Sequence, residues 1–276
     1  MPATEAERLA VARALLLRHH IPARTVAPLR DGREHHLYRV GMTGGSSALL
    51  KVPREDRAPD PRWPGRTALE ALQAERDALQ RLAHLPVPQP YQLLSGPPPG
   101  ALMGVVPGTP PDLVHDRGGL DESLLTAICW EMGRVLAAIH TIRPGEDPGA
   151  IPFRLGCDPE DAVLLHGDYH LGNVLGVVRL GSRWKMTGVV DWTRCYWGQP
   201  ESDLVDLGSS VFATNPWALE PFLAGYRRAG GAELDTRAIT RLIAEDLSER
   251  LDFDPPESLT VRRQWERRIA VWGAAT

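Results

Sequence analysis

Apolar residues in this chain follow two spacings, one typical of strands and one typical of helices. Residues 4–19 carry leucine and valine at helical spacing, and Thr4 with Glu7 forms the capping-box pattern of a helix start. Residues 67–83 repeat the helical spacing more strongly, with four leucines on one face and charged side chains elsewhere. These two stretches predict helices in the N-terminal part.

Strand patterns surround the second of these helices. Short alternating or continuous apolar runs are bounded by glycine, proline and aspartate, as antiparallel hairpins require. The predicted strands are residues 26–29, 36–40, 48–52, 91–94 and 101–106, with turns at Asp31-Gly32 and Gly44-Gly45. The proline-rich residues 107–111 cannot continue a central strand, so they predict the boundary between two parts of the chain.

Helical spacing dominates the second part. The predicted helices are residues 122–140, 203–213, 217–229, 235–251 and 258–272. We therefore predict an α+β protein with two domains, a nucleotide-binding lobe of residues 1–106 and a catalytic and substrate-binding lobe of residues 107–276. The first would hold an antiparallel sheet with one helix, and the second would be mostly helical.

Residues 164–193 interrupt the helical part with a polar loop and a strand hairpin. The loop reads His166-Gly-Asp-Tyr-His-Leu-Gly-Asn173, an apolar strand follows, and a turn at Gly181-Ser182 leads to a returning strand. The returning strand ends in Val-Val-Asp191-Trp, so the hairpin would bring Asp191 back beside Asp168 and Asn173. Two carboxylates and an amide predict an oxygen-rich site suited to Mg²⁺, which prefers oxygen ligands, together with phosphate.

Composition excludes several classes of protein. The chain has 276 residues, 43% hydrophobic and 24% charged, which is ordinary for a globular protein long enough for two lobes. A net charge of −4 implies no general affinity for nucleic acid or anionic membranes. Three scattered cysteines and an N-terminus without a signal-peptide pattern predict a cytoplasmic location.

Lys51 is one of only two lysines in an arginine-rich chain. It ends an apolar alternation, where a lysine usually faces solvent, but a retained lysine also suits a compact charge on a phosphate. Glu75, on the following helix, could pair with Lys51 or be an ordinary solvated helix charge.

Three further polar residues accompany the loop. His166 and His170 could be metal ligands, but histidines in such loops more often bond backbone groups and stiffen the loop. Asp203 could be an N-terminal helix acid or could brace the loop. We expect all three to brace it.

The loop motif resembles the catalytic loop of the aminoglycoside phosphotransferase family, small-molecule kinases with a protein-kinase-like fold. Val189-Val-Asp191-Trp and the segment up to Asp203 resemble that family's metal-binding segment and the helix behind it. Weaker matches are Lys51 with its strand, Glu75 with its helix, and Leu102 to Gly108 with the hinge. Leu171 stands where the family often has proline, which is a mild departure.

The resemblance implies a role for each residue. Asp168 would be the catalytic aspartate, Asn173 and Asp191 would hold Mg²⁺, and Lys51 supported by Glu75 would bind nucleotide phosphates. The backbone of Met103, Gly104 and Val105 would bind the purine of ATP or GTP.

The implied function is transfer of the γ-phosphate of ATP or GTP to a hydroxyl of a small molecule. An antibiotic acceptor is expected, cationic ones such as aminoglycosides or basic peptides included, in a resistance or self-protection role. Kinases of choline, amino acids or sugars remain open, because fold does not fix substrate. From another class, a metal-dependent phosphoesterase and an inactive nucleotide-binding module also remain. No nucleic acid or membrane partner is expected, and the protein would be a monomer or dimer.

Overall fold

The computed structural model describes residues 4–29, 32, 34–54, 65–115, 120–179, 183–253 and 263. It divides into two compact units, unit 1 (Met1–Val106 with Gly149–Ile151) and unit 2 (Pro107–Pro148 with Pro152–Thr276). The return of the chain to unit 1 at 149–151 was not predicted. It is fixed by the backbone N–H of Ala150, which donates to Asp77 Oδ2 at 2.7 Å.

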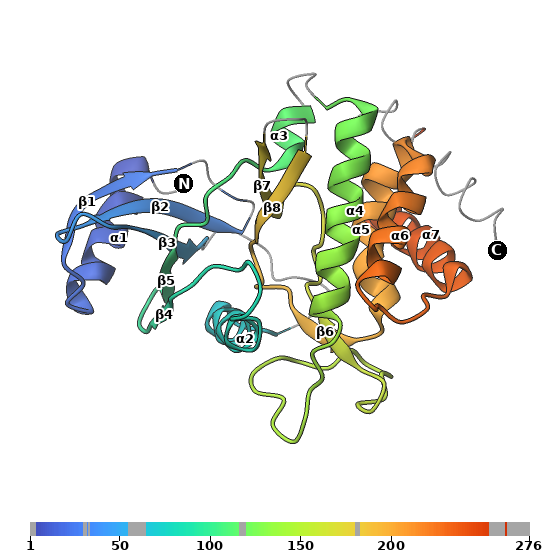
Figure 1. Ribbon diagram of the computed structural model, residues 1–276. Coiled ribbons are helices and arrows are strands. Elements are labelled where there is room, and N and C mark those ends of the chain that lie inside the picture. Colours follow the sequence, from blue (N-terminus) through green and yellow to red (C-terminus); the bar gives the residue numbers. More distant parts are fainter. Residues whose placement is uncertain are drawn as a thin grey trace. The chain divides into compact units, whose positions relative to one another are not determined.

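Unit 1 is built on a five-stranded antiparallel sheet, shown in blue to green in Figure 1. Its strands, in the order β1-β2-β3-β5-β4, are β1 (Ala23–Pro28), β2 (His35–Met42), β3 (Ser47–Pro53), β5 (Gly100–Gly104) and β4 (Tyr91–Leu94). The predicted strands are therefore confirmed. The predicted turn at Asp31-Gly32 lies partly outside the described residues.

Two helices use the two faces of this sheet. Helix α1 (Glu5–Arg18) begins at the predicted capping box and packs Leu15 and Leu16 against one face, with Tyr38, Val40, Leu50, Val52, Leu94 and Leu102. Helix α2 (Ala68–Arg81) begins at a second capping box and packs Leu72 near Ala101 and Met103. Because successive side chains of a strand point to opposite faces, Lys51 shares the α2 face with Leu49.

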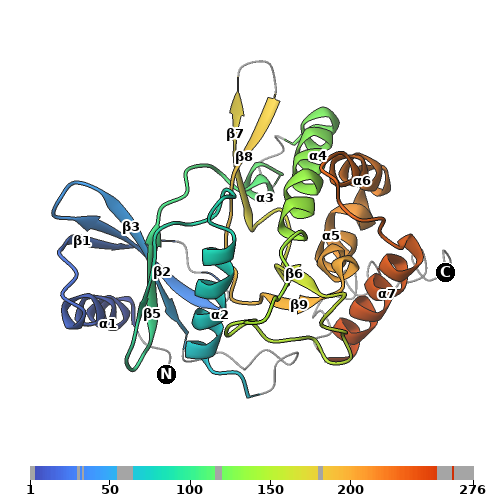
Figure 2. The same cartoon turned by 60° about the horizontal axis from the view of Figure 1, so that its bottom comes forward.

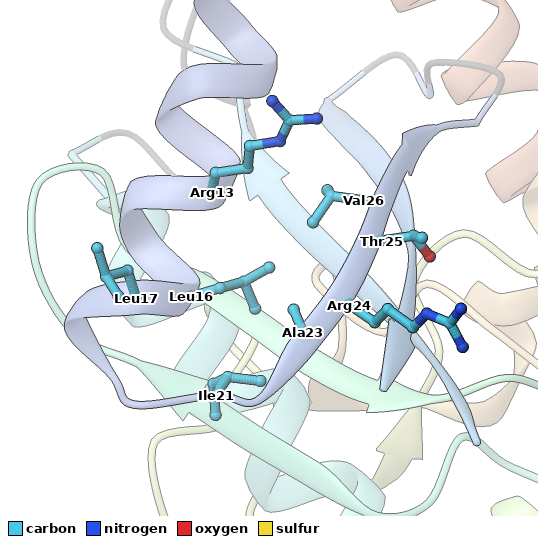
Figure 3. Close-up of a pocket in the computed structure, with 8 residues that line it drawn as sticks. All are labelled: Arg13, Leu16, Leu17, Ile21, Ala23, Arg24, Thr25 and Val26. Carbon is cyan, nitrogen blue, oxygen red and sulfur yellow. The ribbon is translucent and has the colours of Figure 1, made fainter. Parts of the chain in front are cut away.

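A groove of about 440 Å³ lies between α1 and β1 in unit 1 (Figure 3). Its lining residues are Arg13, Leu16, Leu17, Ile21, Ala23, Arg24, Thr25 and Val26. Arg24 and Thr25 point away from α1 in this view. None of the predicted site residues lines this groove.

Unit 2 is organised by two helices that cross closely, α4 (Glu122–Ile139) and α6 (Leu219–Arg228), visible in green and orange in Figure 2. A Cβ added at Gly133 would lie 2.0 Å from the carbonyl oxygen of Phe222, and one at Gly225 would lie 2.0 Å from that of Trp130. Only glycine permits this approach. Helix α7 (Thr236–Phe253) and the short α5 (Val205–Leu207) also belong to unit 2.

Two small antiparallel sheets in unit 2 carry the loop region. Strand β6 (Val163–Leu165) pairs with β9 (Tyr196–Gly198), and β7 (Val174–Arg179) pairs with β8 (Arg183–Val189). The predicted hairpin is confirmed, although its turn lies outside the described residues. Strand β9 was not predicted.

The remaining differences concern helices. A short α3 (Pro111–His115) begins where only a proline-rich boundary was predicted. Residues 203–213, predicted as one regular helix, belong to 3₁₀, α and π segments: η1 (Pro200–Leu204), α5 and η2 (Gly208–Phe212). The predicted helix at 258–272 lies outside the described residues. Within the described part of the chain, no helix has the length and apolar character needed to cross a membrane.

Candidate active site

A buried ion pair joins β3 to α2 in unit 1. Lys51 Nζ donates to Glu75 Oε1 at 2.8 Å, and the two residues are 3% and 1% exposed. The alternatives of a solvent-facing lysine and a solvated glutamate are therefore wrong. Burying two opposite charges is stable only when they are paired, so each residue needs the other.

Strands β4 and β5 position the surroundings of this pair. The hydroxyl of Tyr91, in β4, donates to Oε2, the second carboxylate oxygen of Glu75, at 3.0 Å. Met103 is buried and Gly104 ends β5, where its N–H donates to the carbonyl of Pro90 at 2.9 Å. Val105 is the first residue beyond the strand and is exposed. Of the three predicted purine contacts, Gly104 thus has its N–H already engaged.

The loop of unit 2 brings Asn173 and Asp191 to adjacent backbone positions. Val174 pairs with Val189 at the base of the β7–β8 hairpin, and the N–H of Val190 donates to the carbonyl of Asn173 at 2.9 Å. Asp191 follows with a φ of 65°, a left-handed conformation that is uncommon for residues other than glycine and tolerated by aspartate. Thr193 donates its hydroxyl to Asp191 Oδ1 at 2.8 Å.

Asp168 lies among donors and positive charge. The Asn173 Nδ2 group donates to its backbone carbonyl at 2.9 Å and to Oδ2 at 3.2 Å. On the other oxygen, His170 Nε2 lies 3.7 Å and Arg194 Nη1 3.8 Å from Oδ1. Burial alone raises the pKa of Asp168, but His170 and Arg194 outweigh it and lower the pKa to about 2.

Both loop histidines are bonded to backbone groups. The Nδ1 atom of His166 accepts from the N–H of Asp168 at 3.2 Å, and its Nε2 lies 3.0 Å from the carbonyl of Val190. The Nδ1 atom of His170 accepts from the N–H of Gly172 at 3.0 Å. His166 has both ring nitrogens occupied and is fully buried, which leaves it no lone pair for a metal.

Asp203 binds the backbone at the start of the loop that carries Asp168. Its Oδ2 accepts from the N–H of His166 at 2.8 Å, and its Oδ1 accepts from the N–H of Gly167 at 2.7 Å. Gly167 has a φ of 76°, and a Cβ there would lie 2.1 Å from the carbonyl oxygen of Arg194. The loop is thus clamped between a carboxylate and the segment that follows Asp191.

The donor set suits a hard cation. Because Nδ2 of Asn173 is directed at Asp168, its amide oxygen is the end left to act as a ligand. Asp191 supplies a carboxylate from the neighbouring backbone position. Among the described residues, no group of three or more histidine, cysteine, aspartate or glutamate side chains forms a metal cage. Magnesium is typically held by one or two protein oxygens together with water and phosphate oxygens, so the residues present fit it.

Four residues of these networks were missed in the sequence. Arg194 contacts Asp168, Tyr91 contacts Glu75, and His140 contacts both Asp203 and Tyr226. The Asp191-x-x-Arg194 spacing was a local signal that could have pointed to Arg194. The other three come from distant segments.

The profile of the APH phosphotransferase enzyme family matches residues 25–160 and 151–243 of the chain. The comparison with curated proteins found no match. Among solved structures, macrolide 2′-phosphotransferase MphH from Brachybacterium faecium is 18% identical, with a TM-score of 0.62 and coverage of 95% of this chain and 98% of that one.

Two further structures contain nucleotides. The GDP complex of wild-type aminoglycoside 2′-phosphotransferase-IIIa is 15% identical, with a TM-score of 0.66 and coverage of 97% and 99% of the two chains. Amicoumacin kinase hAmiN, in complex with AMP-PNP, Ca²⁺ and Ami, is 16% identical, with a TM-score of 0.59 and coverage of 98% and 94%.

At these identities the structures show the fold alone, which is the α+β protein-kinase-like fold with a sheet-based N-terminal part and a helical C-terminal part. The family profile extends over most of the chain and includes the loop of Asp168 and the segment of Asp191. The chain therefore belongs to the APH phosphotransferase enzyme family and is a small-molecule kinase.

Proposed function

We propose that this kinase transfers the γ-phosphate of ATP or GTP to a hydroxyl group of a small molecule, with Asp168 as its catalytic residue. The observation that carries the proposal is the arrangement around Asp168. Its carboxylate is kept ionised, it is bonded to Asn173, and Asn173 lies at the backbone position next to that of Asp191. Phosphoryl transfer needs this combination of an oriented nucleophile and charge neutralisation.

The lowered pKa of Asp168 defines how it would act. A carboxylate with a pKa of about 2 is a weak base at neutral pH. It accepts a hydrogen bond from the acceptor hydroxyl and orients the oxygen for in-line attack. The hydroxyl proton is given up late, as a loose phosphoryl-transfer transition state permits.

Asn173 and Asp191 would hold Mg²⁺ through the amide oxygen and the carboxylate. When bound, the cation neutralises the charge that develops on the phosphate oxygens. The direction of the Asn173 amide supports this role, because its nitrogen is already bonded to Asp168.

Lys51 would bind the nucleotide phosphates, and the backbone of Met103 to Val105 would bind the purine. The contact with Glu75 holds the ammonium group of Lys51 in one place, and an ammonium group can donate to more than one acceptor. Since the Gly104 N–H is bonded to Pro90, the backbone of Val105 is the better candidate for contact with the base.

The proposed acceptor is an antibiotic, which would make the protein a cytoplasmic resistance or self-protection kinase. Support comes from the related structures, whose names describe macrolide, aminoglycoside and amicoumacin kinases. A metabolite kinase is the alternative within the same chemistry, because the fold does not select the acceptor.

A metal-dependent phosphoesterase is disfavoured by the histidines. That reaction would use His166 and His170 as ligands, but His166 has both ring nitrogens bonded and His170 has one. An inactive nucleotide-binding module would have no need for an ionised Asp168 held by three different side chains.

The test is a product-mass assay. The protein is incubated with Mg²⁺, ATP or GTP, and panels of hydroxylated antibiotics and metabolites. A gain of one phosphoryl group by an acceptor supports the proposal, and the panel member that gains it identifies the acceptor class. Nucleotide binding without transfer to any compound, or release of phosphate from an ester without nucleotide, would overturn it.

A further inference from the structure

A chain of three buried polar side chains lies beneath the catalytic loop, all within unit 2. Tyr226 belongs to α6, His140 follows the last residue of α4, and Asp203 lies in η1. The Tyr226 hydroxyl lies 2.8 Å from His140 Nδ1, and His140 Nε2 lies 3.3 Å from Asp203 Oδ2. Their exposed fractions are 1%, 5% and 2%, so these groups depend on one another for hydrogen bonds.

The direction of each hydrogen bond follows from the chemistry of the groups. An ionised carboxylate can only accept, so His140 Nε2 carries the hydrogen that is donated to Asp203. With Nε2 as the donor, Nδ1 is the ring nitrogen that accepts, and the Tyr226 hydroxyl donates to it. Burial raises the pKa of Tyr226, which keeps this hydroxyl protonated as a donor. Tyr226 therefore selects the tautomer of His140 that can donate to Asp203.

Asp203 connects this chain to the reacting residue. The same Oδ2 atom that receives His140 also receives the N–H of His166, and Oδ1 receives the N–H of Gly167. Gly167 is the immediate neighbour of Asp168. A rotation of the Asp203 carboxylate would break these backbone bonds and shift Asp168 directly.

A close helix crossing holds these three residues in place. Helices α4 and α6 meet at Gly133 and Gly225, where added methyl groups would collide with backbone carbonyls. Tyr226 follows Gly225 directly, and its ring packs edge-on against that of His140 with centroids 5.7 Å apart. The helix crossing thus fixes the distance between the two rings.

We propose that His140 and Tyr226 are positioning residues for phosphoryl transfer, which act through Asp203 to hold the backbone of His166 and Gly167 and thereby Asp168. The inference rests on the proposed function, because it assigns these residues to the same catalytic loop. Both are buried and act at a distance from the reacting atoms. They therefore affect the rate of the chemical step more than the binding of nucleotide or acceptor.

The first experiment compares kcat and KM in conservative variants. Tyr226→Phe keeps the ring and removes the donor, and we expect kcat to fall by about threefold to tenfold with KM changed by less than about twofold. His140→Leu removes the donor to Asp203 and has a larger effect, whereas His140→Gln restores part of the rate because its amide can donate. Non-additive losses in Tyr226→Phe combined with His140→Leu are expected for residues that act through one path.

Thr240→Val is the matched control. It removes a buried hydroxyl of the same unit, one that donates only to the carbonyl of Thr236 in its own helix at 2.7 Å. A loss of stability without a loss of kcat is expected there. Equal kcat in wild type and Tyr226→Phe, or an equal loss in Thr240→Val, would overturn the proposal.

Hydrogen exchange separates this inference from the proposed function. The amide protons of His166 and Gly167 exchange faster in Tyr226→Phe and His140→Leu than in wild type and in Thr240→Val, if Asp203 is held through them. This measurement needs no acceptor. Faster exchange in a protein that transfers no phosphate would reject the proposed function and support the positioning role of His140 and Tyr226. Unchanged exchange would reject that positioning role whatever the activity.

Discussion

The charged groups of unit 1 and unit 2 are held in different ways. In unit 1, Lys51 and Glu75 form a buried ion pair, and the Tyr91 hydroxyl donates to the second carboxylate oxygen of Glu75. In unit 2, Asp168 is partly exposed and is held by the backbone of its loop, which Asp203 clamps from a neighbouring segment. One site depends on a pair, and the other depends on a network.

The difference teaches where each site is sensitive. Removing one member of a buried ion pair leaves the other charge without its counter-charge in a low-dielectric interior, so stability and function fall together. In a network several hydrogen bonds hold the same loop, so the loss of one side chain lowers the reaction rate more than it lowers the free energy of unfolding. The two sites should therefore respond differently to matched substitutions.

Lys51→Met is expected to have the largest effect. It removes the positive charge beside the buried carboxylate of Glu75, which should lower the free energy of unfolding by about 3–5 kcal/mol. It should also raise the KM for nucleotide by about tenfold to hundredfold through loss of a charged hydrogen bond. Chemical denaturation and steady-state kinetics measure the two effects.

The double variant Lys51→Met with Glu75→Leu is the control for that prediction. An apolar replacement of the whole pair should restore most of the stability and none of the nucleotide affinity. If the double variant remains as unstable as the single one, the interpretation of the contact as a mutually dependent pair is wrong.

Asp191→Asn tests the metal role in unit 2. It retains an oxygen but removes the charge, so the Mg²⁺ concentration for half-maximal rate should rise by about tenfold or more. Unfolding should be little affected. Glu220→Gln, at an exposed ion pair with Arg227, is the matched control, and an equal Mg²⁺ dependence in all three proteins would contradict the assignment.

Arg194→Met tests what keeps Asp168 ionised. Loss of the guanidinium should raise the pKa of Asp168 from about 2 toward its ordinary value of 3.8, as followed by carboxyl ¹³C NMR. Because the pKa of Asp168 is lowered in the folded protein, its ionised carboxylate contributes to stability at pH values above 3.8. This contribution disappears as the pH falls from 3.8 toward 2. The variant should therefore lose less stability than wild type over that interval.

The rate of Arg194→Met should be about threefold to tenfold lower at neutral pH, because Asp168 stays ionised and only its orientation changes. In wild type, an acid limb of kcat/KM with a midpoint above pH 4 must arise from another group. Arg228→Met, which replaces an exposed arginine of α6, should leave both the pKa of Asp168 and the rate unchanged.

Gly133→Ala tests the frame beneath the network. Helix propensity alone predicts stabilisation by about 1 kcal/mol. The collision with the Phe222 carbonyl should outweigh this gain, so the free energy of unfolding, followed by thermal unfolding, should fall by about 1–3 kcal/mol. Thr126→Ala, on the exposed face of α4, is the comparison, and a Gly133→Ala protein as stable as that variant would refute the close crossing.

The elements predicted best from the sequence carry their own start signals. Helices α1 and α2 begin at capping boxes whose hydrogen bonds join residues three apart, so the pattern is complete within one turn. Strand β9 is three residues long and exists because β6 pairs with it, which no local pattern reveals. Helix α3 was missed because Pro111 was taken only as a strand breaker, whereas proline also suits the first turn of a helix.

The site residues also differ in whether a local sequence pattern could reveal them. Asp168, Asn173 and Asp191 could be proposed because one hairpin brings them together over a short stretch of sequence. The contact between Asp168 and Arg194 was overlooked, although Arg194 lies only three residues after Asp191. His140 and Tyr226 are 86 residues apart, and their contact exists only because two glycines let α4 and α6 cross closely. Such distant contacts cannot be read from local spacing.

The most direct test of the central claim is single-turnover transfer from γ-labelled nucleotide by wild type and Asp168→Asn, once an acceptor is identified. Nucleotide affinity is measured on the same samples. We predict that Asp168→Asn binds nucleotide as well as wild type and transfers the label at least about 100-fold more slowly. Transfer by Asp168→Asn at the wild-type rate would contradict the assignment of Asp168 as the catalytic residue.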